Sequence, residues 1–419
     1  MRKILIVGAG QAGLQLALSL QSHDYEVTVM SARTPEEIRG GRVMSTQCMF
    51  GPALQHERDY DLNLWEKQTP DIEGLGLSIA GPDHRRALDW LGELDDYAQS
   101  VDQRVKMSGW LELFEDRGGK VVYHGVTTAD VDALTTYYDL VVIAAGKGEL
   151  VQLFDRDLSR SPYTSTQRIL AVVYVHGMAP RPEHPTMHAV RFNAVPGVGE
   201  LFIMPSFTNS GPCDILFFEG IPGGPLDCWS DRPPADEHLQ RTLHLMRQFV
   251  PWEYERCHDV ELTDGRATLT GGYPPVVRQP VAELPSGGQV LGMADVVVAN
   301  DPITGQGSNS ASKCAASYLA SILERAAQPF DRAWMQQAFD WYWSDAQHTT
   351  IWTNALLAPP PEHVMNLLGA AGTYPEIAHR FVNGFADPTD YQHWFLDPDK
   401  AAEYLASVTS RQGTSPQGT

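Results

Sequence analysis

The first thirty residues alternate between short apolar runs and polar or glycine-rich breaks. Residues 4–7 are continuously apolar, as expected for a strand that is covered on both faces. Residues 11–21 carry Leu14, Ala17 and Leu18 at helical spacing, and residues 26–30 alternate as a second strand. This strand–helix–strand start predicts a parallel sheet.

The pattern changes along the rest of the chain. Residues 31–118 are mixed and rich in turn signals, and a helical, aromatic region begins at residue 329. Apolar runs separated by Pro and Gly, as in an antiparallel sheet with one solvated face, predict strands at residues 169–175, 201–204 and 215–218. Further strands are predicted at residues 120–123, 140–144 and 289–291, and helices at residues 237–249 and 308–325.

Composition narrows the possible partners. The chain has 419 residues, 43% of them apolar and 20% charged, which is typical of a globular protein with two or three domains. Its formal net charge of −21 disfavours nucleic acid and anionic membranes. Five widely spaced cysteines without a CxxC pair indicate reduced thiols in a cytoplasm, and the histidines show no HExxH spacing, so we expect no metal. No apolar run approaches the length of a membrane span.

A GxGxxG motif follows the first predicted strand and opens the first predicted helix. Gly8 permits the tight turn, Gly10 lets the backbone approach a pyrophosphate, and Gly13 lets the helix pack closely on the strand. The helix start also offers N–H groups and a partial positive charge to phosphates. We therefore expect the whole turn, including Gln11 and Ala12, to bind a dinucleotide.

The ribose contact of this dinucleotide stays open. In such folds the second strand is followed by an acidic residue that holds the ribose hydroxyls. Here the strand ends at Met30 and is followed by Ser31, Ala32 and Arg33. Ser31 and Arg33 are the candidates for this contact.

A second glycine-rich motif lies late in the chain. The sequence LGMAD ends in Asp295, and residues 301–309 read DPITGQGSN. Both resemble the late flavin motif of the aromatic-hydroxylase type of flavoprotein, although that family usually has Gly where this chain has Ala294. The resemblance implies that Asp295 binds the flavin side chain or diphosphate and that residues 301–309 lie along the isoalloxazine ring, where a helix N-terminus stabilises negative charge. The residues predicted to bind there are Asp301, Pro302, Gly305, Gln306, Gly307, Ser308 and Asn309.

The two motifs together favour FAD over NAD, and a third position concerns how the flavin is reduced. Single-component hydroxylases of this type carry an Ala-Asp-Gly segment that is linked to NAD(P)H use. At the matching place this chain has Ala144, Ala145 and Gly146, and it has no second GxGxxG motif. Ala145 offers no side-chain hydrogen bond, which favours a flavin reduced elsewhere over drift of a structural turn.

The chain as a whole resembles the styrene/indole monooxygenases, two-component flavoproteins that take reduced FAD from a partner reductase. The resemblance is strongest at residues 8–14, 41–43, 117–120, 138–142, 301–312, 352–354 and 358–362. It implies that Arg42 contacts FAD, and we add Val126, Ala145 and Gly146 to the FAD-binding residues. The implied partners are an NADH-dependent flavin reductase, which supplies FADH2, and O2; a homodimer is left open.

In this family the segment after the arginine lines the substrate pocket. Styrene-type members typically have Asn, Val and His at three alternating positions, and indole-type members have Ser, Gln and Met. This chain has Ser45, Gln47 and Met49, with Ala98 at a further position that is typically Ala in the indole type. An extended segment would place the first three on one face. For Met49, ordinary core filling fits the periodicity equally well.

The resemblance implies an oxygen-transfer reaction. Reduced FAD and O2 give a C4a-hydroperoxide, whose terminal oxygen attacks the C2–C3 bond of indole. The epoxide rearranges to indoxyl, which oxidises to indigo; styrene-like alkenes and aryl sulfides are further expected substrates. Ser45 or Gln47 would hydrogen-bond the indole N–H, and Met49 would pack on the ring.

We therefore expect an α/β protein with a Rossmann-like FAD-binding domain of aromatic-hydroxylase architecture, an antiparallel-sheet substrate domain and a helical C-terminal region. The alternatives are a single-component NAD(P)H-dependent hydroxylase and a non-catalytic FAD-binding protein; a halogenase is disfavoured because the WxWxIP motif is absent. The expected boundaries are a discontinuous FAD domain at residues 1–165 and 275–328 (44–110 partly lining the substrate pocket), a substrate domain at 166–274, a helical region at 329–409 and a flexible tail at 410–419.

Overall fold

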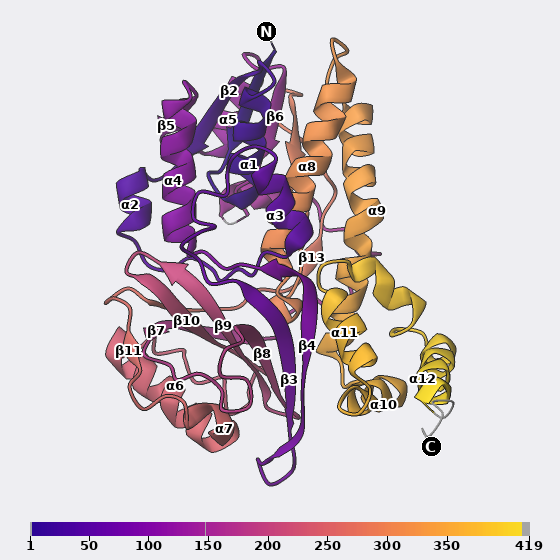
Figure 1. Cartoon of the computed structure of the whole chain (residues 1–419). Helices are drawn as coiled ribbons and strands as arrows, with labels where there is room; N and C mark the ends of the chain where they lie inside the picture. Colours follow the sequence, from indigo (N-terminus) through magenta and orange to yellow (C-terminus); the bar gives the residue numbers. More distant parts are fainter. Residues whose placement is uncertain (1, 147, 413–419) are drawn as a thin grey trace. The chain divides into compact units, whose positions relative to one another are not determined.

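The computed structural model describes residues 2–146 and 148–412 (Figure 1). The chain forms two compact units, each assembled from three stretches of sequence. The first unit comprises Met1–Lys67, Val101–Thr166 and Tyr273–Gln347, and the second comprises Gln68–Ser100, Gln167–Gly272 and His348–Thr419. The fold class is confirmed: mixed α/β, with a parallel sheet, a second sheet that is mostly antiparallel, and C-terminal helices.

The first unit is built on a six-stranded sheet in the order β14-β15-β6-β1-β2-β5. All neighbouring strands are parallel except β14 and β15. Ile4, Leu5 and Ile6 are fully buried, which confirms a strand covered on both faces. The strands are β1 (Lys3–Val7), β2 (Glu26–Ser31), β5 (Lys120–Tyr123), β6 (Leu140–Ile143), β14 (Val281–Glu283) and β15 (Gln289–Gly292), and the pair β13 (Val276–Val277) and β16 (Val298–Ala299) forms a small separate sheet.

Helices of the first unit pack on this sheet around one apolar core. Helix α1 coincides with the predicted span, and α8 begins one residue before its predicted start. The helices are α1 (Gln11–Gln21), α2 (Pro35–Arg39), α3 (Gly51–Arg58), α4 (Gln103–Asp116), α5 (Thr128–Leu134) and α8 (Gly307–Arg325), with short 3-10 turns η1 (Glu149–Leu153), η2 (Ala294–Val296) and η3 (Pro302–Thr304). Helix α9 (Arg332–Leu357) begins in this unit.

The second unit contains an eight-stranded sheet, with β12 pairing β7 beside the main path β11-β7-β10-β9-β8-β3-β4. Its pairs are antiparallel except β3 with β8, which are parallel. The strands are β3 (Ile72–Ala80), β4 (Arg86–Ala98), β7 (Ile169–His176), β8 (Ala189–Val195), β9 (Gly199–Thr208), β10 (Gly211–Gly220), β11 (Glu261–Leu262) and β12 (Thr268–Gly271).

Strands β3 and β4 lie in the stretch that the sequence pattern left as mixed and turn-rich. They add residues 68–100 to the second unit, whereas the expected boundaries placed these residues in the first domain. The glycines of β3 are the reason the pattern was obscured. A Cβ on Gly76 would lie 1.6 Å from the Arg191 guanidinium, and one on Gly74 would lie 2.6 Å from the Gly92 carbonyl oxygen. These glycines give room to neighbours within a sheet and do not mark turns.

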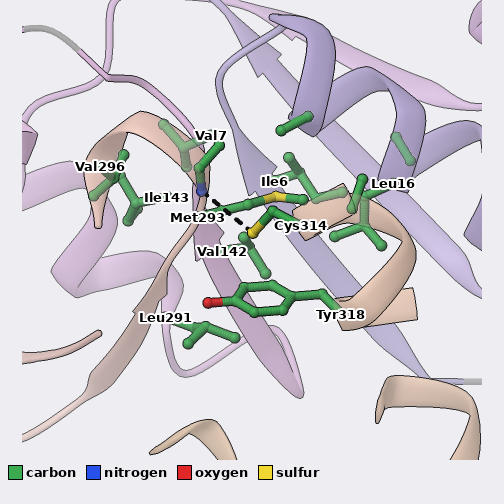
Figure 2. Close-up of a cluster of buried hydrophobic side chains, with 14 of the residues drawn as sticks. Ile6, Val7, Leu16, Val142, Ile143, Leu291, Met293, Val296, Cys314 and Tyr318 are labelled. Carbon is green, nitrogen blue, oxygen red and sulfur yellow. Dashed lines mark hydrogen bonds between the residues drawn. The ribbon is translucent and has the colours of Figure 1, made fainter. Parts of the chain in front are cut away.

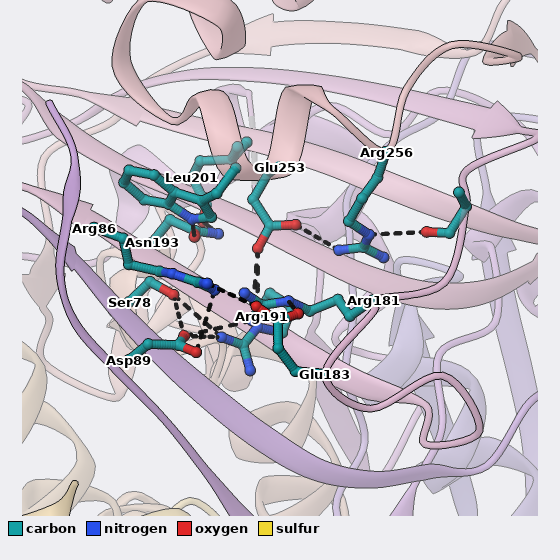
Figure 3. Close-up of polar contacts among 12 residues, drawn as sticks. Ser78, Arg86, Asp89, Arg181, Glu183, Arg191, Asn193, Leu201, Glu253 and Arg256 are labelled. Atoms are coloured by element: carbon teal, nitrogen blue, oxygen red, sulfur yellow. Dashed lines mark hydrogen bonds and ion pairs between the residues drawn. The ribbon is translucent and has the colours of Figure 1, made fainter.

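One face of this sheet is closed by helices α6 (Ala235–Phe249) and α7 (Pro251–Tyr254). Beside the apolar contacts lies a charged cluster (Figure 3), in which the buried Arg191 donates to the more exposed Asp89 at 2.7 Å and Arg256 contacts the buried Glu253 of α7. Glu253 is fully buried and also lies 3.9 Å from both Arg181 and Arg191. The cluster ties α7 to strands β4 and β8.

The C-terminal segment of the second unit is helical and aromatic, as predicted from residue 329 onward. It contains the end of α9, α10 (Glu362–Ala371), α11 (Pro375–Asn383), the 3-10 turn η4 (Pro388–His393) and α12 (Pro398–Gln412). Trp352 stacks on Tyr391 with ring centroids 4.3 Å apart. Helix α12 includes residues 410–412 of the expected tail, and residues 413–419 lie outside the described part of the chain. Among the described helices, none is both long and apolar enough to cross a membrane.

Candidate flavin and substrate site

The three glycines of the GxGxxG turn have different surroundings. Gly8 has φ of +122°, and a Cβ there would lie 2.8 Å from the backbone of Ala144. A Cβ on Gly13 would lie 2.1 Å from the Gly8 carbonyl oxygen. A Cβ on Gly10 would meet no protein atom within 4 Å. The fold itself therefore requires Gly8 and Gly13, whereas the open space at Gly10 fits the approach of a pyrophosphate to the start of α1.

The side chain of Gln11 points into the protein. Its amide nitrogen donates to Glu57 of α3 at 3.1 Å and to Gln15 at 3.2 Å. Glu57 also forms a buried ion pair with Lys106 of α4. A dinucleotide contact of Gln11 is therefore left to its backbone, and the same holds for Ala12, which is buried.

The end of β2 distinguishes the two ribose candidates. The Ser31 hydroxyl donates to the Arg33 carbonyl oxygen at 2.6 Å and accepts from the Arg33 N–H at 3.3 Å, so it is used within its own turn. The Arg33 side chain is exposed, with one guanidinium nitrogen 2.9 Å from the Met44 sulfur. Arg33 is the better placed of the two to reach a ligand.

Asp295 lies beside Gly146, where a Cβ would come 2.9 Å from the Asp295 Cβ. Its side chain is exposed, and it follows Ala294, whose φ of +52° is in the left-handed region. The family's usual glycine would adopt this conformation without strain. Cys314 of α8 supports the turn, because its sulfur accepts from the Ala294 N–H at 3.4 Å (Figure 2).

The late motif forms the start of α8. Asp301 is buried and caps the η3 turn by accepting from the Ile303 N–H at 3.2 Å, and Pro302 occupies the first position of that turn. Gly305 has φ of +63°, and a Cβ on Gly305 or Gly307 would meet no protein atom within 4 Å. This helix start is open to a ligand on the side of its glycines. Gln306, the N-cap residue, is buried.

Asn309 binds the predicted substrate segment to this helix. Its amide nitrogen donates to the Cys48 carbonyl oxygen at 2.8 Å, and its amide oxygen accepts from the Phe50 N–H at 2.9 Å. Ser308 adds a longer contact, 3.5 Å, to the Gln47 amide oxygen. Residues 47–50 are thus held directly against the α8 start.

The predicted pocket residues differ in burial. Gln47, Cys48 and Met49 are buried and Ser45 is partly exposed, and the shared face of Ser45, Gln47 and Met49 stays a prediction. Bonds to α8 and to the Val101 carbonyl oxygen hold this segment in place. The Gln47 amide has partners at both ends, and the Ser45 hydroxyl donates to the Thr46 carbonyl oxygen at 3.0 Å.

Arg42, the predicted FAD contact, has an exposed side chain. The backbone of the residue before it is held by a buried arginine. The buried Arg104 lies 3.4 Å from the Gly41 carbonyl oxygen and pairs with Asp102 at 2.8 Å. Val126 lies in the loop after β5 and packs partly against the core, and Ala145 follows β6 and is partly exposed. Ala98 is fully buried at the end of β4 in the second unit.

No sequence motif indicated four buried charged residues in the first unit. Lys106, Glu57, Arg104 and Asp102 are each almost fully buried. Isolated charges on amphipathic helices normally indicate solvated positions, and no spacing signal distinguishes these four. Among residues 2–146 and 148–412, no group of three or more His, Cys, Asp or Glu is suited to hold a metal ion.

The chain has the fold of flavin-dependent halogenases and hydroxylases. The flavin-dependent brominase Bmp2 has a TM-score of 0.60 at 14% identity, with 97% of this chain and 92% of that chain covered. An oxygenase of 2-methyl-3-hydroxypyridine-5-carboxylic acid has a TM-score of 0.56 at 13% identity, covering 90% and 93%. At these identities the likeness concerns the fold alone.

The comparison of sequences identifies the family more specifically than the comparison of folds. Residues 146–256 match a family model described as "Styrene monooxygenase A putative substrate binding domain". The chain is 30% identical to styrene monooxygenase StyA of Pseudomonas fluorescens over 415 residues (96% of this chain, 97% of the relative) and 30% identical to a StyA of Pseudomonas sp over 417 residues. The chain therefore belongs to the styrene monooxygenase StyA family.

Proposed function

We propose that this chain is the oxygenase component of a two-component flavin monooxygenase of the indole type, and that it receives FADH2 from an NADH-dependent reductase. The observation that carries the proposal is the clamp between Asn309 and residues 48–50. Within one unit it joins the segment with the indole-type Ser45, Gln47 and Met49 to the glycine-rich helix start that resembles a flavin site.

The surroundings of the motifs fit FAD. Gly10 leaves space for a pyrophosphate, Arg33 and Arg42 present exposed positive charges, and Asp295 presents an exposed carboxylate beside Gly146. The start of α8 offers backbone N–H groups to the electron-rich end of the flavin ring. Bound reduced FAD would supply the oxygen-activating chemistry by reacting with O2.

The protein's own residues would bind, orient and shield the substrate. The Ser45 hydroxyl would accept a hydrogen bond from the indole N–H and so fix the orientation of the ring. Met49, which is only 1% exposed, would form an apolar wall of the pocket. The buried Gln47 holds the segment between α8 and Val101 so that this geometry persists. Styrene-like alkenes and aryl sulfides lack the N–H and are proposed as secondary substrates.

The deciding experiment supplies FADH2 from any flavin reductase and compares oxygenated products from indole and styrene. Indole turnover that equals or exceeds styrene turnover supports the proposal, and styrene epoxidation many-fold faster than indole oxidation refutes the indole assignment. Steady NADH oxidation by the chain alone would instead identify a single-component hydroxylase. Absence of any product with supplied FADH2 would identify a non-catalytic flavin-binding protein.

A further inference from the structure

Helices α1 and α8 of the first unit pack side by side and run in the same direction (Figure 1). Gln15, in α1, donates from its amide nitrogen to the Ser312 carbonyl oxygen of α8 at 3.2 Å. Tyr25, which follows α1, donates from its hydroxyl to the carbonyl oxygen of Ile322, near the end of α8, at 3.4 Å. Because the order of these contacts is the same along both helices, the starts of α1 and α8 lie at the same end of the pair.

The bond between Gln15 and Ser312 lies close behind both helix starts. Helix α1 begins at Gln11, four residues before Gln15, and α8 begins at Gly307, five residues before Ser312. At 1.5 Å per residue, the bond lies roughly 6 to 8 Å behind each start. A Cβ on Gly10 or Gly307 would meet no protein atom within 4 Å, so both starts have space for a ligand. The bond therefore controls the separation of two open helix starts.

This bond is one side of a triangle of hydrogen bonds that joins α1, α8 and α3. The Ser312 hydroxyl of α8 donates to the Ala53 carbonyl oxygen of α3 at 3.4 Å. The Gln11 amide nitrogen of α1 donates to the Glu57 carboxylate of α3 at 3.1 Å. The side chains of Gln11, Gln15, Glu57 and Ser312 are all buried. Each of the three helices is thus bonded to the other two inside the unit.

Directional bonds matter here because the other buried residues of α1 are mostly apolar. Apolar contacts are non-directional, and a buried polar pair is a known way to fix the register of two packed helices. The Ser312 carbonyl oxygen and the Glu57 carboxylate can only accept, so Gln15 and Gln11 must each present an amide nitrogen to them. A shift of α8 along α1 would leave these buried groups without partners.

We infer that Gln15 is a positioning residue: it sets the spacing between the starts of α1 and α8, and this spacing determines how tightly the chain binds FAD. The inference rests on the proposed function, in which FAD contacts both helix starts. A ligand that contacts two sites through one molecule binds tightly only when the sites are held at the separation that its own length spans. Loss of the Gln15 bond should therefore weaken the binding of FAD. It should not affect the two halves of FAD, because each half contacts one helix start.

The test compares Gln15→Met with the matched control Gln21→Met on the same helix. The Gln21 amide nitrogen donates to the carbonyl oxygens of Phe114 and Arg117 at the end of α4, at 3.3 and 2.8 Å, so both variants lose an amide bond between helices. In anaerobic titrations of the full chain, reduced FAD should bind to Gln15→Met at least five-fold more weakly than to wild type. The affinities for ADP and for reduced riboflavin should stay within two-fold, and Gln21→Met should bind all three ligands as wild type does. An unchanged FAD affinity in Gln15→Met, or an equal loss for FAD and ADP, would overturn the inference.

A second variant tests the same triangle without any change in α1. Ser312→Ala removes the hydroxyl bond to Ala53, and it should also weaken the binding of reduced FAD while ADP binds as before. Its control is Ser321→Ala, which loses a hydroxyl bond to Ser317 within α8 and should bind FAD like wild type. Equal FAD affinities in Ser312→Ala and Ser321→Ala would contradict the role of the triangle.

Product formation separates this inference from the proposed function. If FAD binding follows the expected pattern but supplied FADH2 gives no oxygenated product, the oxygenase proposal fails and the positioning role of Gln15 stands. If product forms and every variant binds FAD as wild type does, the positioning role fails and the oxygenase proposal stands. A wild-type chain that binds no reduced FAD would overturn both.

Discussion

Asn309 bonds to the backbone on both sides of Met49, accepting from the Phe50 N–H and donating to the Cys48 carbonyl oxygen. A residue of the flavin-type motif thus sets the path of the segment that carries the indole-type residues. A substitution at the start of α8 should consequently alter the conformation of residues 47–50 even when no ligand is bound.

Asn309→Asp removes the amide donor while keeping the side chain's shape. Cys48 reports the effect, because it is buried and burial raises the pKa of its thiol to about 12, which protects it from alkylation. We expect the variant to lose about 2 kcal/mol of stability and alkylation of Cys48 to accelerate at least ten-fold. Cys314, fully buried in the same unit, is the internal control. Equal acceleration at both thiols would indicate global unfolding and contradict the local clamp.

Gly10→Ala and Gly13→Ala should separate ligand binding from folding. The Gly10 variant places its methyl group in open space, so its stability should stay within about 1 kcal/mol of wild type while FAD binds at least ten-fold more weakly. The Gly13 variant should be strongly destabilised, because its methyl group overlaps the Gly8 carbonyl oxygen. Gly265→Ala, at an open position of the second unit, is the control for flavin titration and thermal melting. Unchanged FAD affinity in Gly10→Ala would argue against the pyrophosphate assignment.

Ser45→Asn introduces the styrene-type residue. We expect the ratio of styrene to indole turnover to rise several-fold, because the longer amide displaces the proposed acceptor for the indole N–H. Product analysis with both substrates in one reaction measures the ratio directly. An unchanged ratio of styrene to indole turnover would contradict the proposal that Ser45 lines the substrate pocket.

Ala294→Gly should be tolerated, although Ala→Gly substitutions usually destabilise. Relief of the left-handed strain, about 1 kcal/mol, offsets the added freedom of the unfolded chain. Denaturant unfolding should give a stability within about 0.5 kcal/mol of wild type, whereas Ala320→Gly, at an exposed position of α8, should lose about 1 kcal/mol. A loss as large at position 294 would show that the turn does not strain alanine.

His238 should make the protein acid-sensitive. His238 is buried and stacks on Trp229 with ring centroids 4.4 Å apart. Its pKa is lowered to about 4, mainly by burial and to a smaller extent by the positive charge of Arg241. The unfolded chain takes up the proton near pH 6.5, so stability is fully present above that pH and falls between pH 6.5 and 4, by up to about 3 kcal/mol. His238→Phe should flatten this dependence in urea titrations, and His244→Gln, exposed on the same helix, should not. Parallel curves for wild type and His238→Phe would refute the assignment.

The sequence was most informative where pattern and backbone chemistry agree. The continuous run at residues 4–7 and the glycines at 8, 10 and 13 predicted β1, the turn and α1, because a parallel strand and a tight turn each demand these residue types. Strand β3 was missed because Gly74 and Gly76 resemble turn signals, and only their neighbours Gly92 and Arg191 explain them.

Within the site, residue types could be predicted and contacts could not. The flavin-type motif and the indole-type triplet were recognisable in sequence, but the bonds of Asn309 join residues about 260 positions apart. The bonds that hold Gln47 to Val101 and the Cys48 carbonyl to Asn309 come from residues far along the chain, so the spacing of Ser45, Gln47 and Met49 gave no sign of them. Buried Lys106 could not be distinguished from a solvated lysine without Glu57 beside it.

The ion pair between Lys106 and Glu57 has a consequence for the history of this family. Loss of either charge alone leaves the other buried without its counter-ion beside Gln11, a cost of about 3 kcal/mol or more, whereas joint replacement by apolar residues can be nearly neutral. Positions 57 and 106 should therefore covary among descendants of a common ancestor. Lineages that abandoned one charge would have had to abandon both, and single-charge intermediates should be rare.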